Sequence, residues 1–221
     1  MQEGSAATVT RFADRAEAGR ALADHLAQAP NLFAPVVIAL PRGGVPVGAE
    51  VARRLGAPLL VMPVGKVGAP GQEELALGAV APGGVTVLND SVVAALGLGR
   101  DEVDRLVAQA SARVAEQQRA YGGRPLAPLE GRSAIVVDDG LATGATMRAA
   151  LVAVRRLQPA QLVLAVPVAP PSVLLALAPL ADAQVCLRQP PRMQAVGSWY
   201  RDFTQTSGRE VTDLLRELGP G

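Results

Sequence analysis

The 221-residue sequence has little of what several classes of protein need. It contains one cysteine, Cys186, and one histidine, His25, which excludes an internal disulfide and a histidine-rich metal site. The net charge is +1 and no basic run is present, so we expect no nucleic-acid partner. Every apolar stretch is interrupted before it reaches spanning length, and the N-terminus does not have the pattern of a secretory signal. These absences predict a cytoplasmic protein with no membrane partner.

What is abundant predicts the fold class. Alanine, valine and leucine supply much of the 49% hydrophobic content, which suits buried parallel strands between helices. A short β-branched run (33–40), a helical stretch (44–56) and a second apolar run (58–64) form a strand–helix–strand unit. The sequence therefore predicts an α/β protein with a parallel sheet flanked by helices.

The remaining elements follow the same patterns. The spacing of apolar residues is clearest in a predicted helix over 101–120. Further helices are expected at 11–29, 144–157, 171–178 and 209–218, and further strands at 133–137, 161–168 and 183–187. Residues 76–89 are predicted to form a hairpin. The segment 65–75, which carries glycine, proline and charge, is predicted to be a mobile loop.

The stretch IVVDDGLATGATM (135–147) places two adjacent aspartates, Asp138 and Asp139, where a buried strand is predicted to end. Adjacent carboxylates repel each other and burial adds a desolvation cost, so a polar group is expected to meet them. A tight turn (140–144) then opens a helix, whose free N–H groups attract phosphate. A sugar phosphate supplies a phosphate for the turn and a vicinal diol for the acids. The alternative is an ordinary strand–turn–helix connection with a solvated acid pair.

This stretch resembles the signature with which type I phosphoribosyltransferases bind 5-phosphoribosyl-1-pyrophosphate (PRPP). The predicted order of elements over 33–188 also matches the core of that family. The resemblance implies one domain, 1–221, whose small hood is formed by the N-terminal segment and residues 189–221. It implies that Asp138 and Asp139 hold the ribose hydroxyls. The residues that would hold the 5′-phosphate are Gly140, Leu141, Ala142, Thr143, Gly144, Ala145 and Thr146.

The segment ALPRGGVPVG (39–48) falls where this family has its pyrophosphate loop. By that resemblance Arg42, Gly43 and Gly44 would face the pyrophosphate, through an unusual peptide geometry. The alternative is a plain strand-to-helix turn with Arg42 in solvent. More narrowly, the stretches LPRGG, K-x-G-x-P, ALGAV and VG-x-WY are similar to bacterial phosphoribosyltransferase-domain proteins for which no acceptor is settled.

Lys66 is the only lysine among 21 basic residues and follows the run at 58–64. Its flexible stem and compact ammonium suit a pyrophosphate contact, and the alternative is a surface lysine without a role. Glu73 and Glu74 lie in the predicted loop. They could touch Mg²⁺, and the alternative is a solvated loop face.

Aromatic residues make up only 3% of the chain, and half of them lie in PPRMQAVGSWYRDF (190–203). Because aromatic rings stack on planar heterocycles, Trp199, Tyr200 and Phe203 are candidates to line an acceptor site. The alternative is a packing cluster that anchors the tail to the core.

The resemblance implies transfer of a 5-phosphoribosyl group from PRPP to a nitrogenous base, with release of pyrophosphate. Arg42, Lys66, Asp138 and Asp139 would be the catalytic residues. Mg²⁺ would bind through PRPP, bridging the pyrophosphate and the ribose hydroxyls, and the two aspartates could contact it through water. A homodimer is compatible with the resemblance. Two alternatives stay open: a non-catalytic regulator that senses PRPP or a nucleotide, and an enzyme that hydrolyses PRPP. The residues do not specify the acceptor.

Overall fold

The computed structural model describes residues 11–28, 32–122 and 126–220, without the side chains of residues 72–74. Its centre is a five-stranded sheet in the order β2–β1–β6–β7–β8, in which every neighbouring pair is parallel. The strands are β1 (Val36–Ala39), β2 (Leu59–Val61), β6 (Ser133–Val137), β7 (Gln161–Val168) and β8 (Ala183–Arg188). Every residue of β1 and β6 is buried, as expected for strands covered on both faces.

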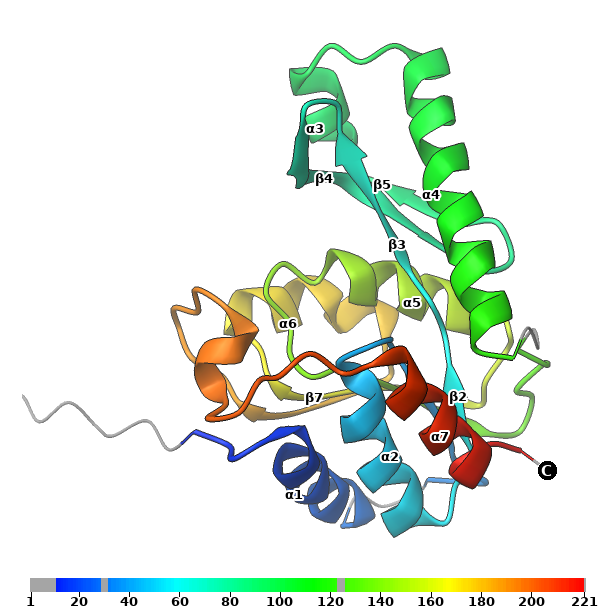
Figure 1. The fold of residues 1–221 in the computed structure, drawn as a ribbon, viewed down its shortest axis with the longest axis vertical. Helices are drawn as coiled ribbons and strands as arrows, with labels where there is room; N and C mark the ends of the chain where they lie inside the picture. The colour runs from blue at the N-terminus through cyan, green and yellow to red at the C-terminus, as the bar shows by residue number, and fades with distance from the viewer. Residues whose placement is uncertain (1–10, 29–31, 123–125, 221) are drawn as a thin grey trace, which may run out of the picture.

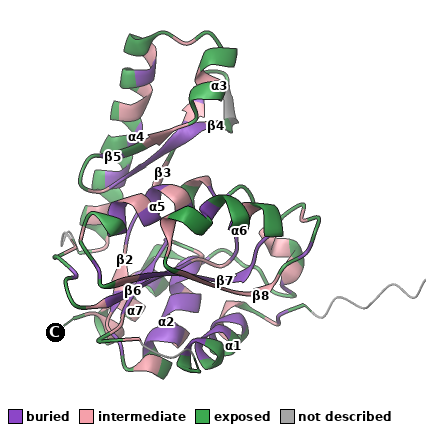
Figure 2. Ribbon diagram, turned by 180° about the vertical axis from the view of Figure 1, so that it is seen from behind, coloured by how far each residue is buried: buried purple, intermediate pink, exposed green. Residues whose placement is uncertain are grey.

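Helices cover both faces of this sheet (Figure 1). On one face lie α1 (Arg15–Ala27), α2 (Gly44–Leu55) and α7 (Gly208–Leu218), and on the other lie α5 (Ala145–Arg155) and α6 (Pro171–Leu177). The two cores between sheet and helices contain most of the buried residues, which appear as the purple centre of Figure 2. Two short 3₁₀ helices, η1 (Ala178–Leu180) and η2 (Val196–Trp199), complete the C-terminal half.

The chain between β2 and β6 forms a smaller unit, which we call the arm, that rises from the core (Figure 1). Its antiparallel sheet has the order β3–β4–β5, and helices α3 and α4 accompany it. The elements are β3 (Gly65–Ala69), β4 (Gln72–Ala81), β5 (Val85–Leu88), α3 (Asp90–Ala95) and α4 (Arg100–Ala120). The arm has its own apolar cluster, in which Val67, Leu77 and Val80 of the sheet meet Ala110 and Val114 of α4.

The predicted fold class is confirmed: a parallel sheet is flanked by helices, and a small hood is present, formed by the antiparallel sheet of the arm. The expectation of a loop at 65–75 was wrong, because β3 and the start of β4 pair there, with Lys66 opposite Ala79. The sequence also gave no expectation of α3, whose Asn89 side chain accepts a hydrogen bond from the backbone of Val92. The part that the N-terminal and 189–221 segments play over the acceptor stays a prediction.

In the part of the chain that the structure describes, no helix combines the length and the hydrophobicity that crossing a membrane requires.

Candidate functional site

The carboxyl ends of β1 and β6 lie side by side because these strands pair in parallel, with Ala39 opposite Val137. The chain leaves β1 through Leu40, whose backbone N–H donates to the carbonyl of Val137 at 2.9 Å, and enters α2 at Gly44. The peptide bond between Pro41 and Arg42 is cis. The predicted pyrophosphate loop (42–44) therefore stands against the end of β6, where ligands bind in open α/β sheets.

Gly43 brings this loop into contact with Asp139. A Cβ atom placed on Gly43 would lie 2.1 Å from Oδ2 of Asp139 and 2.7 Å from its Cγ. Only a residue without a side chain allows the backbone to pass so close to a carboxylate. The structure thus joins two predicted site segments that are far apart in the sequence.

Asp138 and Asp139 directly follow β6 and form what we call the acid pair. The backbone N–H of Asp139 donates to Oδ1 of Asp138 at 2.9 Å. Burial raises the pKa of Asp138 well above its ordinary value, and repulsion from Asp139 raises it further. Burial also raises the pKa of Asp139, although the hydrogen bond from the Arg15 guanidinium opposes that rise. Two desolvated acids side by side favour ligands that donate hydrogen bonds or bring positive charge.

The raised pKa predicts how Asp138→Asn affects stability. A carboxyl group with a higher pKa in the folded state binds its proton more tightly there, so stability falls as pH rises from the unfolded pKa of about 4. At pH values above the folded pKa, the full cost of ionising the buried Asp138 carboxyl is subtracted from the stability of the fold. Asparagine keeps the hydrogen-bond acceptor without the charge, so Asp138→Asn is expected to be more stable than the wild type at pH 7.

Urea unfolding at pH 7 and at about pH 3.5 measures this effect. Most of the gain should disappear at the lower pH, where Asp138 is protonated in the folded chain and largely protonated in the unfolded chain. Asp139→Asn is the matched control, and it should gain less because it also loses its ion pair with Arg15. An Asp138→Asn variant that is no more stable than the wild type at pH 7 would contradict the burial argument.

The predicted phosphate turn (140–146) connects the acid pair to α5. Gly144 is the N-cap of α5 and adopts φ of 75°, which glycine tolerates and a β-branched residue does not. Leu141 is buried in the core, so it can offer a ligand only its backbone. The side chains of Thr143 and Thr146 are exposed at the start of the helix, where free N–H groups and the helix dipole favour an anion.

A cavity of about 840 Å³ lies between part of the arm and the start of α5. Lys66 lines it from β3, and Thr143, Ala145 and Thr146 line it from the phosphate turn. Arg42 is exposed on the pyrophosphate loop. The structure therefore places Lys66 near the phosphate turn, and Arg42 on a loop that contacts the acid pair.

The predicted aromatic candidates occupy different environments. Tyr200 is 2% exposed, and its hydroxyl donates to the backbone carbonyl of Asp139 at 2.6 Å. Its ring centroid lies 5.7 Å from Phe12 and 5.1 Å from Phe203. Trp199 packs partly against the same cluster, whereas Phe203 keeps 37% exposure. Packing therefore accounts for Tyr200, and Phe203 is the most exposed residue of the three, although Arg15 lies over its ring.

Arg15 is the site residue that sequence reasoning missed. It begins α1, yet its Nε donates to Oδ2 of Asp139 at 2.8 Å across 124 positions of the chain. No local motif marks Arg15 among 20 arginines. Only the arrangement of α1 beside the end of β6 brings the two together.

Within the described residues, no three histidine, cysteine, aspartate or glutamate side chains come together to hold a metal ion. The side chains of Glu73 and Glu74, proposed to touch Mg²⁺, lie outside the description. His25 is exposed on α1. Cys186 packs against the core, and burial raises the pKa of its thiol to about 11, so it is a poor nucleophile.

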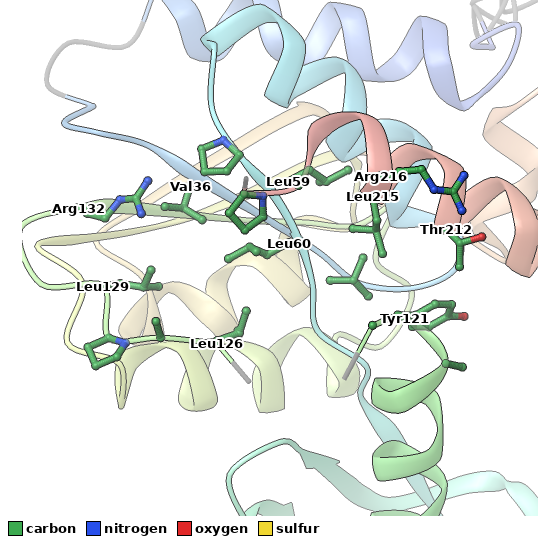
Figure 3. A pocket seen from close by; sticks show the side chains of 18 residues that line it. Val36, Leu59, Leu60, Tyr121, Leu126, Leu129, Arg132, Thr212, Leu215 and Arg216 are labelled. Carbon is green, nitrogen blue, oxygen red and sulfur yellow. The ribbon is translucent and has the colours of Figure 1, made fainter. Parts of the chain in front are cut away.

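A second cavity, of about 730 Å³, lies elsewhere on the core (Figure 3). Leu59, Leu60, Tyr121 and Leu215 give it apolar walls, and Val36 and Arg132 place it at the amino ends of β1 and β6. None of the described residues that line it is acidic. Because open α/β sheets bind ligands at the other end of their strands, the acid pair is the better candidate.

Comparison with known proteins shows the family to which the chain belongs. A family model described as a phosphoribosyl transferase domain matches residues 10–177. A protein of Mycobacterium tuberculosis named "Putative phosphoribosyl transferase MT0597" is 49% identical over 207 residues, which cover 92% of this chain and 46% of that protein. The chain therefore spans about half the length of the curated relatives it matches.

Two solved structures extend the comparison. TT1426 from Thermus thermophilus is 43% identical, with a TM-score of 0.80 over 95% of this chain and 100% of that one. AQ2163 from Aquifex aeolicus is 12% identical, with a TM-score of 0.52 over 94% of this chain and 87% of that one. At 12% identity, the similarity to AQ2163 concerns the fold alone.

Proposed function

Because the chain belongs to the phosphoribosyl transferase domain family, we propose that it transfers the 5-phosphoribosyl group of PRPP to a nitrogenous acceptor, such as a nucleobase. The reaction breaks the bond between ribose C1′ and pyrophosphate and forms a bond from C1′ to nitrogen. The observation that carries the proposal is the contact between Gly43 and the acid pair, directly before a phosphate turn at a helix start.

The proposed roles follow from what each segment can offer. Asp138 and Asp139 accept hydrogen bonds from the 2′ and 3′ hydroxyls, and the turn (140–146) binds the 5′-phosphate through backbone N–H groups and hydroxyls. Arg42 and Lys66, with the backbone of the pyrophosphate loop, stabilise the leaving pyrophosphate. Positive charge develops on the ribose and negative charge on the leaving group, so preorganised electrostatics supply most of the rate.

Magnesium fits this donor set as a partner of the substrate. Mg²⁺ is commonly held by one or two carboxylates together with substrate phosphates and several waters, so it needs no cage of protein ligands. A cation near the acid pair would relieve the repulsion from Asp139 that raises the pKa of Asp138, and would compensate the burial that raises the pKa of Asp139. When bound, it would neutralise charge on the pyrophosphate.

The acceptor site is proposed beside the segment 199–203. Trp199 and Phe203 retain exposed surface. The Arg15 guanidinium covers one face of the Phe203 ring, so a planar base would stack on Trp199 and pack against the exposed part of Phe203. The buried ring of Tyr200 would support that wall from behind.

The direct test measures pyrophosphate release from PRPP and Mg²⁺ with a panel of purine, pyrimidine and pyridine bases. We expect release that requires one class of base. Release without any base would favour hydrolysis, and tight PRPP binding without release under every condition would favour a sensor.

Asp138→Asn and Asp139→Asn test the ribose assignment through their affinity for PRPP. Each change is nearly isosteric, and each removes a charged acceptor, so PRPP should bind about tenfold or more weakly. Calorimetry measures the affinity, and circular dichroism checks the fold. Unchanged PRPP affinity in both variants would remove the acid pair from the ribose site.

A further inference from the structure

Asp139 is contacted from parts of the chain that are distant in sequence. Arg15, on α1, donates from Nε to Oδ2 at 2.8 Å, and Tyr200 donates from its hydroxyl to the backbone carbonyl at 2.6 Å. The backbone of Gly43 passes the same carboxylate closely. A carboxylate has two oxygens, each able to accept, so the Arg15 contact on Oδ2 fixes the direction in which Oδ1 points.

Arg15 is itself held in place. Its Nη1 donates to the carbonyl of Thr204 at 2.8 Å, and its guanidinium carbon lies 3.8 Å from the centroid of the Phe203 ring. The side chain is 11% exposed, so it has little freedom to turn away. A planar guanidinium held by a ring on its face and by a carbonyl at Nη1 presents its Nε–H in a fixed direction.

The chain also contains an ordinary pair for comparison. Arg54 of α2 donates to Asp24 of α1 at 3.0 Å, but these side chains are 57% and 66% exposed, against 11% and 13% for Arg15 and Asp139. Exposed pairs contribute little, whereas removing one partner of a buried pair leaves an uncompensated charge. The Arg15–Asp139 pair therefore stands out by its burial and by its place at the end of β6.

We propose that Arg15 is a positioning residue, which holds the carboxylate of Asp139 in the orientation that binds one ribose hydroxyl. The inference rests on the proposed function, because it requires a ribose beside Asp139. Hydrogen bonds weaken steeply when donor and acceptor are misaligned. Without Arg15, the carboxylate can rotate and bind the hydroxyl less well.

This role has a signature that a purely structural role does not share. A positioning residue for the hydroxyl changes the preference between a sugar that has that hydroxyl and one that does not. A residue that merely stabilises the fold would weaken the binding of both sugars alike. The ratio of two affinities therefore separates the two roles.

The experiment measures dissociation constants of ribose 5-phosphate, 2-deoxyribose 5-phosphate and 3-deoxyribose 5-phosphate by calorimetry. The proteins are the wild type, Arg15→Met, Arg15→Lys and the matched control Arg54→Met. We expect the wild type to prefer ribose 5-phosphate over at least one deoxy sugar. In Arg15→Met that preference should fall about tenfold, the scale of one charged hydrogen bond. Arg15→Lys should retain part of it, and Arg54→Met all of it.

The outcomes distinguish the inference from the proposed function. A full preference in Arg15→Met overturns the positioning role and leaves the ribose site intact. A wild type that binds no ribose 5-phosphate, or that prefers it over neither deoxy sugar, contradicts the proposed site, and the inference fails with it. If Arg15→Met does not fold, the test rests on Arg15→Lys. An undiminished preference for ribose 5-phosphate in that variant also overturns the positioning role of Arg15.

Discussion

Gly43→Ala is expected to weaken PRPP binding by about tenfold or more, the scale of losing one charge-assisted hydrogen bond. The added Cβ would lie 2.1 Å from Oδ2 of Asp139, a distance that no native Cβ contact tolerates. The carboxylate cannot simply move aside, because Arg15 holds the same oxygen at 2.8 Å. Either the pyrophosphate loop shifts or Asp139 loses its ion pair, and both changes disturb the site.

Calorimetry with PRPP and Mg²⁺ measures this effect. Gly99→Ala serves as the control, because a Cβ at Gly99 meets nothing within 4 Å and its φ of −72° suits alanine. Wild-type PRPP affinity in Gly43→Ala, with the fold intact, would show that the close approach to Asp139 has no part in binding.

Lys66→Met is expected to lower kcat by about 10²-fold or more, the range for losing one preorganised electrostatic contact. Pyrophosphate carries more negative charge after its bond to ribose breaks than before. A cation directed at it therefore interacts more strongly in the transition state than with bound PRPP. Methionine keeps a long flexible stem and removes only the charge. Lys66→Arg should recover part of the loss, because it restores charge with a different geometry.

Two positions are open to the Lys66 ammonium, beside the leaving pyrophosphate or beside the 5′-phosphate. Steady-state kinetics with an active acceptor, together with PRPP affinity from calorimetry, distinguishes them. The cavity that Lys66 lines also contains Thr143 and Thr146 of the phosphate turn. The charge of the 5′-phosphate does not change during the reaction, so a contact there would weaken PRPP binding and spare kcat. Such a result would move Lys66 from the leaving group to the 5′-phosphate, and wild-type values of both would remove it from the site.

The core elements could be predicted because their signals are local. The helix expected at 101–120 is found at Arg100–Ala120, and the strand expected at 133–137 is found at those residues. The strands within the segment 65–75 could not be predicted from local signals. Glycine at 65 suggests a loop, but in β3 it is needed because a Cβ would lie 2.8 Å from Val114 of α4. A requirement set by a residue 49 positions away leaves no trace in the local sequence.

The same distinction applies to the site. Asp138 and Asp139 lie in a continuous motif with the phosphate turn, so the sequence is enough to nominate them as site residues. The partners of Asp139 come from the two ends of the chain, through Arg15 and Tyr200. An arginine at a helix start and a tyrosine in an aromatic segment each have ordinary explanations. Their convergence on one residue depends on the three-dimensional arrangement.

The placement of the arm between β2 and β6 has a consequence for folding kinetics. Strand β1 pairs with β2 across a short separation, since Val37 is opposite Leu59, but with β6 across 98 residues, since Val36 is opposite Ala134. Closing the longer loop costs about 1.3 kcal/mol more in chain entropy. The β1–α2–β2 unit can therefore form early, while the pairing of β1 with β6 belongs to a later step. A folding intermediate with only the first unit in place would have the pyrophosphate loop without the acid pair, and would bind no substrate.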